Sequence, residues 1–412
     1  MVQTIAIIGA GASGLFAAIT AARMGAKVTV YEKQNKVGKK ILASGNGKCN
    51  FTNLTLSKDD FRCSHPSFVA TALQIFNQKD TLEFFTSLGV AYKNRNDYVY
   101  PVTNQSSTIQ EILLATCLQY QVQIELEHEL IKLEFDQSKN QFKLHIQDVS
   151  NLVEGLYFDK VILANGSKAS DKLGGNESGY RIAKSMGHKI VPIVPALVQL
   201  KSSYRDCKSI AGVRCDGTVK LFVNQQLKST QTGELQFTDY GISGIPVFQL
   251  SRIAAYALKD LCSCSCSLDL LPTHSADEIY RIIQLKYTTF RPCSYHELFS
   301  GIIHAKLLNS ILKRLSIHSN TKVVSLQDEV LQKIISTIKE FTMEIADTNG
   351  FSNAQICAGG VDVSQISDTM ESKIRKGLYF AGELMDVDGI CGGYNLQWAW
   401  TSGYLAGLNA AK

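Results

Sequence analysis

The hydrophobic pattern of the first 32 residues predicts a strand, a turn, a helix and a second strand. Residues 4–9 read TIAIIG, a β-branched apolar run, and residues 15–24 (LFAAITAARM) carry apolar side chains at helical spacing. Gly25 marks the end of this helix, and AKVTVYE continues as a second apolar strand. Such an order is typical of a βαβ unit, so we expect an α/β fold.

Further along the chain, the period of the pattern changes several times. Residues 66–120 read mostly as helix, and residues 122–147 alternate as strands before FDKVILANGS, a buried strand that runs into a turn. After Pro192 and Pro195, short alternating segments as far as CSCSCSLDLL indicate a β-rich region, interrupted by a helix near PVFQLSRIAAYAL. We therefore expect a first segment over residues 1–190 and a β-rich insertion over 191–273.

Helical periodicity returns at Ser275 and continues to about residue 346. Ser275 with Glu278, and Ser325 with Asp328, have the spacing of capping boxes at helix starts. The chain then ends with KGLYFAGE as a strand, LMDVDGICGG as a glycine turn and YNLQWAWTSGYLAG as a helix. These patterns predict a helical insertion over residues 274–350 and a return to the first domain over 351–412.

Composition and charge narrow the class of protein. The 412 residues are 45% hydrophobic and 19% charged, as in soluble proteins with more than one core. The net charge of +5 is spread along the chain, so we expect a small-molecule substrate and no nucleic-acid partner. Glycines interrupt the uncharged run 4–22, so we expect no membrane span. Eleven cysteines without a secretory signal indicate reduced thiols and a cytoplasmic location; the oligomeric state stays open.

The first turn has the fingerprint of a dinucleotide-binding site. Gly9 permits a tight turn, Gly11 lets the backbone approach a diphosphate, and Gly14 lets the helix pack close to the strand. Glu32 ends the second strand 18 residues after Gly14, where an acid suits a ribose with free hydroxyls. The fingerprint predicts cofactor contacts here, at Gly9, Gly11, Ala12, Ser13, Gly14, Glu32 and Lys33. It does not choose between NAD and FAD.

The C-terminal region favours FAD. LYFAGE is a late strand ending in Gly382 and Glu383, and in flavoproteins with two dinucleotide-binding domains such an acid holds the ribityl chain. A second glycine turn, CGGYN, opens the last helix, whose N-terminal partial charge favours reduced flavin. To Gly382 and Glu383 we therefore add four predicted FAD contacts, which are Asp388, Gly393, Asn395 and Leu396.

Long motifs in the same order make the chain similar to the BaiN/YhiN-like family of FAD-dependent oxidoreductases, also described as aminoacetone-oxidase-like. They are GAGASGLFAA, GKKILASGNGKCNFTN, GELQFTDYGISG, AGGVDV with TMESK, and GLYFAGELMDVDGICGGYNLQWAWTSGYLAG. The resemblance implies a Rossmann-like FAD-binding domain, split in sequence, with a β-barrel-like and a helical domain inserted. Lys48 and Asp239 depart from the family pattern, which often has Arg and His there.

The segment SGNGKCN follows the second strand, where related flavoproteins run a glycine-rich loop past the diphosphate. Backbone N–H groups and amide side chains there suit anionic oxygens. Predicted contacts in this region are Lys40, Ser44, Gly45, Asn46, Gly47 and Asn50, and we add Leu130 and Gly166 elsewhere. Cys49 has three interpretations: a packing residue, a thiol on the substrate side of the flavin, or a metal ligand. With no second cysteine in the loop, a dithiol mechanism is not expected.

The chemistry expected from the resemblance is hydride transfer through flavin N5. It implies reduction of an activated carbon–carbon double bond, as in a steroid-like substrate, with NAD(P)H as a transient reductant. We place Tyr394 and Cys49 as candidate catalytic donors. Alternatives are an oxygen-using oxidase of a small amine, a flavin-binding redox module without turnover, and a site for NAD alone. No second GxGxxG is present, so we expect the reductant to share the substrate pocket.

Other chemistry-bearing residues read as structural. Cys262, Cys264 and Cys266 share one face of a strand and have no histidine at ligand spacing, so we expect buried cysteines and no metal site. Trp398 and Trp400 lie within the last helix and are expected in the core rather than as a substrate platform.

Overall fold

The computed structural model describes residues 2–290 and 293–412, which form two compact units. Unit 1 comprises residues 1–193 and 356–412, and unit 2 comprises residues 194–355. Each unit has its own hydrophobic core. Unit 2 holds both the β-rich region and the helices that the sequence analysis assigned to two separate insertions, and that finer division stays a prediction.

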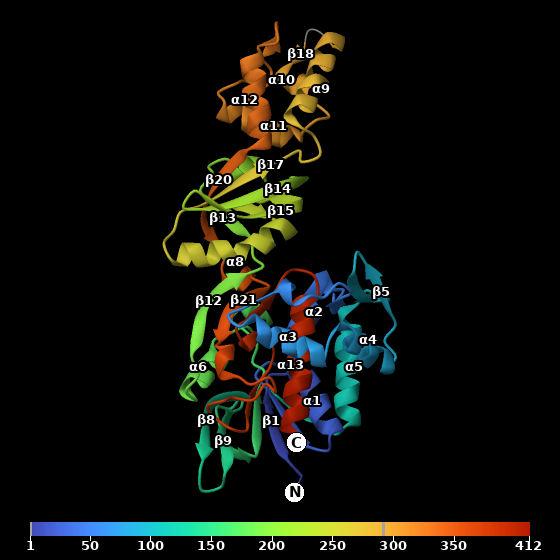
Figure 1. Ribbon diagram of the computed structural model, residues 1–412, viewed down its shortest axis with the longest axis vertical. Coiled ribbons are helices and arrows are strands. Elements are labelled where there is room, and N and C mark those ends of the chain that lie inside the picture. The colour runs from blue at the N-terminus through green and yellow to red at the C-terminus, as the bar shows by residue number, and fades with distance from the viewer. Residues whose placement is uncertain (1, 291–292) are drawn as a thin grey trace. The chain divides into compact units, whose positions relative to one another are not determined.

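Unit 1 is organised around a five-stranded parallel sheet (Figure 1). The strand order is β22 (Leu378–Phe380), β11 (Lys160–Leu163), β1 (Thr4–Ile8), β2 (Lys27–Glu32) and β7 (Gln123–Leu126). The central strand β1 is almost fully buried, as its continuous apolar run predicts. Because β22 comes from the end of the chain and pairs with β11, the sheet brings both ends of the sequence into one layer.

The first and last helices of unit 1 lie side by side, blue and red in Figure 1. They are α1 (Ala12–Arg23) and α13 (Tyr394–Ala410). Two glycines of α13 permit the contact: a Cβ on Gly403 would lie 2.5 Å from the Ser13 carbonyl oxygen, and one on Gly407 would lie 2.4 Å from that of Ala17. Trp398 and Trp400 are buried in the same core, as predicted.

The region 66–120 is mostly helical, as predicted, but it also contains a β-hairpin that was not predicted. The structure has three helices here, α3 (Pro66–Ile75), α4 (Gln78–Ser87) and α5 (Ser106–Gln119). A hairpin of β5 (Tyr92–Arg95) and β6 (Tyr98–Pro101) lies between α4 and α5. Asn77 divides the first two helices, because its side chain accepts a hydrogen bond from the Lys79 N–H and caps α4. Asn96 and Asp97 form the hairpin turn with positive φ angles of 50° and 66°.

Smaller elements complete unit 1. The sheet β10–β9–β8 consists of β8 (Glu129–Asp136), β9 (Gln141–Gln147) and β10 (Val153–Phe158). The remaining elements are α2 (Lys39–Ala43), β3 (Thr52–Asn53), β4 (Phe61–Cys63), α6 (Ser178–Ser185) and β23 (Val387–Gly389). The chain leaves unit 1 along β12 (Ile190–Ala196) and returns along β21 (Ile356–Val361), and these two strands pair with each other.

Unit 2 contains a closed antiparallel barrel of order β13–β16–β15–β14–β17–β20. Its strands are β13 (Leu200–Ser202), β14 (Arg214–Val223), β15 (Gln226–Phe237), β16 (Gly241–Ser243), β17 (Cys264–Asp269) and β20 (Phe341–Thr348). Cys264 and Cys266 face its core, as predicted, but Cys262 precedes β17 and is only partly buried, so the prediction is wrong for Cys262. The prediction that helix continues to residue 346 is wrong, because β20 closes the barrel, with alternate side chains Phe341, Met343 and Ile345 buried.

Helix α8 (Ile245–Lys259) packs on the barrel, and a helical group follows β17. This group contains α9 (Ala276–Thr289), α10 (Tyr295–Phe299), α11 (Ala305–Arg314) and α12 (Asp328–Lys339), with short elements α7 (Cys207–Ile210), β18 (Cys293–Ser294) and β19 (Lys322–Val323). The Ser275–Glu278 capping box is confirmed. The predicted Ser325 cap is wrong: α12 begins at Asp328, after Gln327, which makes no side-chain cap.

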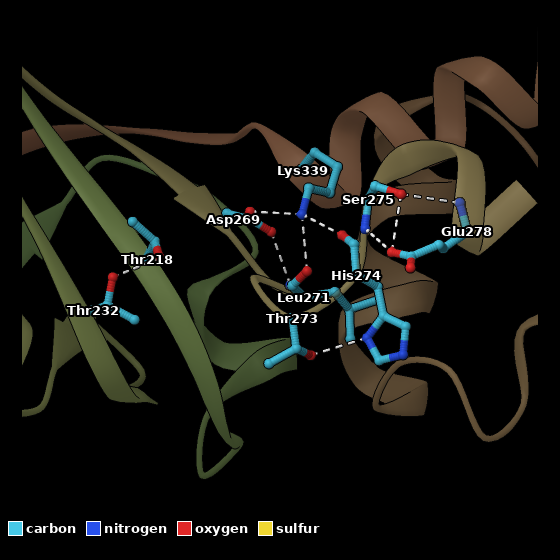
Figure 2. Close-up of polar contacts among 9 residues, drawn as sticks. All are labelled: Thr218, Thr232, Asp269, Leu271, Thr273, His274, Ser275, Glu278 and Lys339. Carbon is cyan, nitrogen blue, oxygen red and sulfur yellow. Dashed lines mark hydrogen bonds and ion pairs between the residues drawn. The ribbon is translucent and has the colours of Figure 1, made fainter.

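A lysine fixes the link between barrel and helices inside unit 2 (Figure 2). Lys339 Nζ at the end of α12 lies 2.7 Å from Asp269 Oδ2 and donates to the carbonyl oxygens of Leu271 at 2.8 Å and His274 at 2.7 Å. All three ammonium protons therefore have acceptors on one short connection between β17 and α9.

Within the described part of the chain, no helix has both the length and the apolar character needed to cross a membrane.

Candidate functional site

The turn after β1 is packed tightly on one side and open on the other. A Cβ on Gly14 would lie 1.9 Å from the Gly9 carbonyl oxygen, so only glycine lets α1 start this close to the strand. A Cβ on Gly11 would have no atom within 4 Å. The N-terminus of α1, with Ala12 and Ser13 in its first turn, therefore faces free space where N–H groups without intrahelical acceptors favour an anion.

Glu32 at the end of β2 is held beside this turn. One carboxylate oxygen accepts a hydrogen bond from the Ala10 N–H and the other from the Gln34 N–H, both at 2.8 Å. Because each carboxylate oxygen has further lone pairs, the group keeps capacity for ribose hydroxyls. Leu130 is buried in β8, two residues after His128, whose N–H donates to the Glu32 carbonyl oxygen. Lys33 directly follows Glu32 and is partly buried.

Glu383 comes to the same end of the sheet from the far end of the sequence. Lys40 Nζ lies 2.6 Å from Glu383 Oε2, and the two side chains are 32% and 18% exposed. The second carboxylate oxygen, Oε1, is buried without a hydrogen-bond partner. Gly382 is in contact with α1, since a Cβ there would lie 2.4 Å from Ser13 Oγ.

The loop from Ser44 to Asn53 packs against the start of α13. A Cβ on Gly393 would lie 2.6 Å from the Thr52 carbonyl oxygen and 2.9 Å from Asn50 Oδ1. Asn53 Nδ2 donates to the Gly392 carbonyl oxygen at 3.0 Å, and Trp400 Nε1 donates to that of Phe51 at 2.8 Å. The two glycine turns of the sequence thus form one structural unit.

The backbone of this loop has a left-handed course. Gly45 and Asn46 have φ angles of 55° and 54°, and Gly47 has 81°. Asn46 is exposed, whereas Ser44 is partly buried and its hydroxyl donates to the Ile41 carbonyl oxygen. Such successive turns direct N–H groups toward a common point, which is the arrangement of an anion-binding nest.

Asn395 orders the second glycine turn rather than leaving its side chain free. Its Oδ1 accepts from the Gly389 N–H at 2.8 Å and its Nδ2 donates to the Gly389 carbonyl oxygen at 2.9 Å. The predicted contacts of Asn395 and Leu396 with a cofactor stay a prediction, and they would use the backbone N–H groups in the first turn of α13. Asp388 lies in β23 opposite Arg62 of β4 and is buried.

The residues present fit FAD. Three side-chain oxygens are buried without hydrogen-bond partners near the two turns: Asn50 Oδ1, Asn165 Oδ1 and Glu383 Oε1. Gly11 and Gly166 both border open space, and Gly166 follows β11 with a φ of 73°. Buried polar atoms of folded proteins are normally paired, so this group of acceptors together with free N–H groups suits a bound polyol and diphosphate.

The two candidate donors have different surroundings. Tyr394 is 6% exposed, its hydroxyl donates to the Thr55 carbonyl oxygen at 3.3 Å, and burial raises its pKa. Cys49 is fully buried among core side chains, and burial raises the pKa of its thiol to about 12. Both groups therefore keep their protons at neutral pH. The position of Cys49 favours packing, and its catalytic role stays a prediction.

Sequence reasoning missed two contributors to the site. Asn165 stands between the predicted strand and Gly166, but its unpartnered oxygen depends on burial that sequence does not show. Hairpin β5–β6 was hidden within a region expected to be helical, although the alternating YVY after Asn96 and Asp97 is a hairpin signal. Lys48 and Asp239, which depart from the family pattern, are both exposed.

Residues 2–290 and 293–412 contain no group of three or more His, Cys, Asp or Glu side chains placed to hold a metal ion. In that same part of the chain all eleven cysteines are free thiols.

Comparisons with known proteins identify the family. The HI0933-like protein Rossmann domain matches residues 3–409. A 3-dehydro-bile acid delta(4,6)-reductase of Clostridium scindens is 42% identical over 416 residues, with 99% of each chain covered. A ribosomal RNA dihydrouridine synthase of Haemophilus influenzae is 32% identical over 419 residues, with 98% of each covered.

A solved structure supports the fold alone. The 3-ketosteroid delta1-dehydrogenase of Sterolibacterium denitrificans aligns with a TM-score of 0.51 at 12% identity, covering 99% of each chain. The α/β Rossmann-like fold, the family resemblance and the assignment as a flavoprotein oxidoreductase are confirmed. The exclusion of nucleic acid stays a prediction, since one relative is named for ribosomal RNA. The chain belongs to the HI0933-like family of Rossmann-domain flavoproteins.

Proposed function

We propose that the protein binds FAD and reduces a carbon–carbon double bond conjugated to a carbonyl group in a small organic substrate, with NAD(P)H as reductant. The observation that carries this proposal is the 42% identity, over 99% of both chains, with a 3-dehydro-bile acid delta(4,6)-reductase. In such a substrate the 3-keto group activates the double bonds. The net reaction adds two hydrogens: NAD(P)H gives a hydride, and a proton completes the new C–H pair.

The first part of the site serves to bind and orient the cofactor. The α1 N-terminus holds the diphosphate and Glu32 holds the adenosine ribose. Glu383 Oε1, Asn165 Oδ1 and Asn50 Oδ1 are buried without partners and would accept hydrogen bonds from ribityl or ring groups of the cofactor. FAD bound there supplies hydride chemistry at flavin N5.

The second part concerns the ring and the proton. The partial positive charge at the start of α13 would favour negative charge on a flavin ring held beside it. Tyr394 provides a hydroxyl that is protonated at neutral pH; its single proton is directed at the Thr55 carbonyl oxygen and has to leave that acceptor to reach a substrate. We assign to Tyr394 Oη the proton that the substrate takes up. The Cys49 thiol lies in the core, and we include it in the test as the alternative donor.

The test is anaerobic reduction of FAD-loaded protein by NADH and NADPH, followed by addition of 4-androstene-3,17-dione as the enone probe. We expect NAD(P)H-dependent saturation of the ring double bond, detected by mass spectrometry. Tyr394→Phe should lower kcat about 100-fold, the usual size of a general-acid contribution, while Cys49→Ser changes it little. Release of hydrogen peroxide from a small amine, without NAD(P)H consumption, would instead establish an oxidase.

A second candidate function follows from the 32% identity with a ribosomal RNA dihydrouridine synthase. Dihydrouridine is uridine whose C5–C6 double bond, conjugated to the C4 carbonyl, has been saturated. The chemistry is therefore the same, and the two candidates differ only in substrate size and charge. Incubating the reduced protein with unmodified ribosomal RNA and measuring dihydrouridine in the digest separates them.

A further inference from the structure

Strand β6 carries two tyrosines on one face. Tyr98 and Tyr100 are two residues apart, so their side chains point to the same side of the strand. Val99 and Pro101 point to the opposite side and are buried. Both tyrosines are partly exposed, which separates them from the fully buried aromatic rings of the core.

Each of these tyrosines contacts one of the two glycine turns of the site. A Cβ on Gly392 would lie 2.8 Å from Tyr98 Cε1 and 3.2 Å from Tyr394 Cε2. A Cβ on Gly45 would lie 3.5 Å from Tyr100 Cε1. The tyrosine face of β6 therefore extends from the loop of residues 44–53 to the start of α13, beside Tyr394.

The hairpin is held in this position by the loop itself. Strand β3 pairs with β6 in antiparallel register, Thr52 opposite Val99 and Asn53 opposite Tyr98. Thr52 Oγ1 in turn donates to Gln397 Oε1 of α13 at 2.6 Å, in a fully buried contact. Burial, and next the Cys391 side chain, raise the pKa of both Tyr98 and Tyr100, so they remain neutral phenols beside the turn.

We propose that Tyr98 and Tyr100 form an aromatic wall at the flavin end of the site, which selects flat, conjugated substrates by stacking. This inference rests on the proposed function for the class of substrate, but not for the place of the wall. Tyr98 and Tyr100 are not fully buried in the core. Next to a cofactor turn, such a partly exposed aromatic face offers an apolar surface with hydroxyl groups at its edge. Tyr98 and Tyr100 act here as specificity residues.

The first experiment measures binding of 4-androstene-3,17-dione to the FAD-loaded protein from the change in the flavin absorbance spectrum. Tyr98→Leu and Tyr100→Leu should each raise the Kd of the probe about five- to tenfold, the worth of one aromatic contact, and leave the Kd of FAD within about twofold. Tyr98→Phe and Tyr100→Phe keep the ring and should raise the Kd of the probe less than about threefold. Tyr92→Leu, on the exposed strand β5 of the same hairpin, is the matched control.

A second readout needs neither substrate nor turnover. Tyrosine close to a flavin quenches its fluorescence, and tryptophan quenches more strongly. Tyr98→Leu and Tyr100→Leu should therefore increase the fluorescence of the bound FAD, and Tyr98→Trp and Tyr100→Trp should decrease it. Unchanged flavin fluorescence in all four variants would contradict the proposal that Tyr98 and Tyr100 lie beside the flavin. Leucine variants that lose FAD while keeping the affinity for the probe would also overturn it.

The two readouts separate the two proposals. If the wild-type protein binds no enone but the fluorescence changes as expected, the proposed substrate class fails and the wall stands. If the protein reduces the enone but the variants bind it as tightly as the wild type, the wall fails and the proposed function stands. If a leucine variant has a melting temperature well below that of Tyr92→Leu, the flavin fluorescence of Tyr98→Trp and Tyr100→Trp is used instead to test the proposal.

Discussion

At the scale of single residues, the site is defined by polar atoms whose partners lie far away in sequence. Glu383 has one oxygen paired with Lys40, 343 residues earlier, and the other oxygen left for a ligand. The glycine turns, Glu32 and Glu383 could be predicted, because each is required by a local backbone motif. The Lys40–Glu383 pair, Asn165 and Tyr98 could not, because they meet only after the sheet and the hairpin have formed.

Replacing Lys40 tests whether the ion pair orients Glu383. Lys40→Met leaves the carboxylate without its cation, so we expect the Kd of FAD to rise about five- to tenfold, as for a partly exposed charge pair worth roughly 1 kcal/mol. Lys40→Arg should stay within about twofold of the wild type. Lys36→Met, an exposed lysine three residues before α2, is the control in the fluorescence titration. Equal affinities of Lys40→Met and Lys36→Met would exclude an orienting role.

A second residue-scale prediction concerns pH. His188 is buried, with Nε2 2.9 Å from Ser372 Oγ and its ring edge-on to Phe380, and burial lowers its pKa. In the unfolded chain a histidine titrates near its ordinary value of about 6.5. Below that pH the unfolded state binds the proton more readily, so stability falls as the pH decreases until the lower folded-state pKa is reached.

We therefore expect the free energy of unfolding of the wild type to fall by up to about 1.4 kcal/mol per pH unit from this residue below pH about 6.5. His188→Gln keeps a side-chain hydrogen-bond partner for Ser372 but does not titrate, so its curve of unfolding free energy against pH should be shallower there. Urea denaturation at a series of pH values measures both curves. Parallel curves would show that His188 contributes nothing to acid sensitivity.

At the scale of elements, local signals predicted most of the fold and failed where tertiary structure decides. The Ser275–Glu278 cap and the barrel strands β13, β14, β15 and β17 follow from spacing and alternation, whereas the three-residue strand β16 was not predicted. Strand β20 was taken for helix because it directly follows α12, although Phe341, Met343 and Ile345 alternate with polar residues. Its strand form is determined by β13 and β17, which offer two free edges from distant parts of the sequence.

The Lys339 cluster of Figure 2 makes an element-scale prediction. Lys339→Met removes the partner of Asp269 and the donor for two carbonyl groups, so we expect unit 2 to lose about 1–3 kcal/mol of stability. Lys333→Met, on the exposed face of the same helix, should change it by less than about 0.5 kcal/mol. Differential scanning calorimetry compares the two. If both variants melt alike, the lysine is not a structural clamp.

At the scale of the whole molecule, the two hydrophobic cores coincide with the two units. Every buried residue of the second core lies between Leu200 and Ile345, inside the continuous segment 194–355. The first core needs both ends of the chain, since β22 and α13 come after unit 2. Sequence periodicity indicated these changes of character, but which segments share a core depends on long-range contacts.

This division predicts that residues 194–355 fold alone. We expect the isolated segment to unfold cooperatively on heating, with a circular dichroism spectrum of mixed helix and strand, and to bind no FAD. Residues 1–193 alone, which lack β22 and α13, should neither fold cooperatively nor bind FAD. A non-cooperative transition in the 194–355 segment would mean that its core depends on unit 1.

The pairing of β12 with β21 has a consequence for how the polypeptide tolerates change. The segment between these two strands is one long insertion into the unit that contains the nucleotide-binding sheet, and the pairing of β12 with β21 holds the two ends of the insertion together. Closing such an insertion becomes only slightly harder as it lengthens, by about 0.6 kcal/mol for each doubling. Insertions or deletions between β12 and β21 therefore add little to the cost of closing this segment, so its length is free to vary.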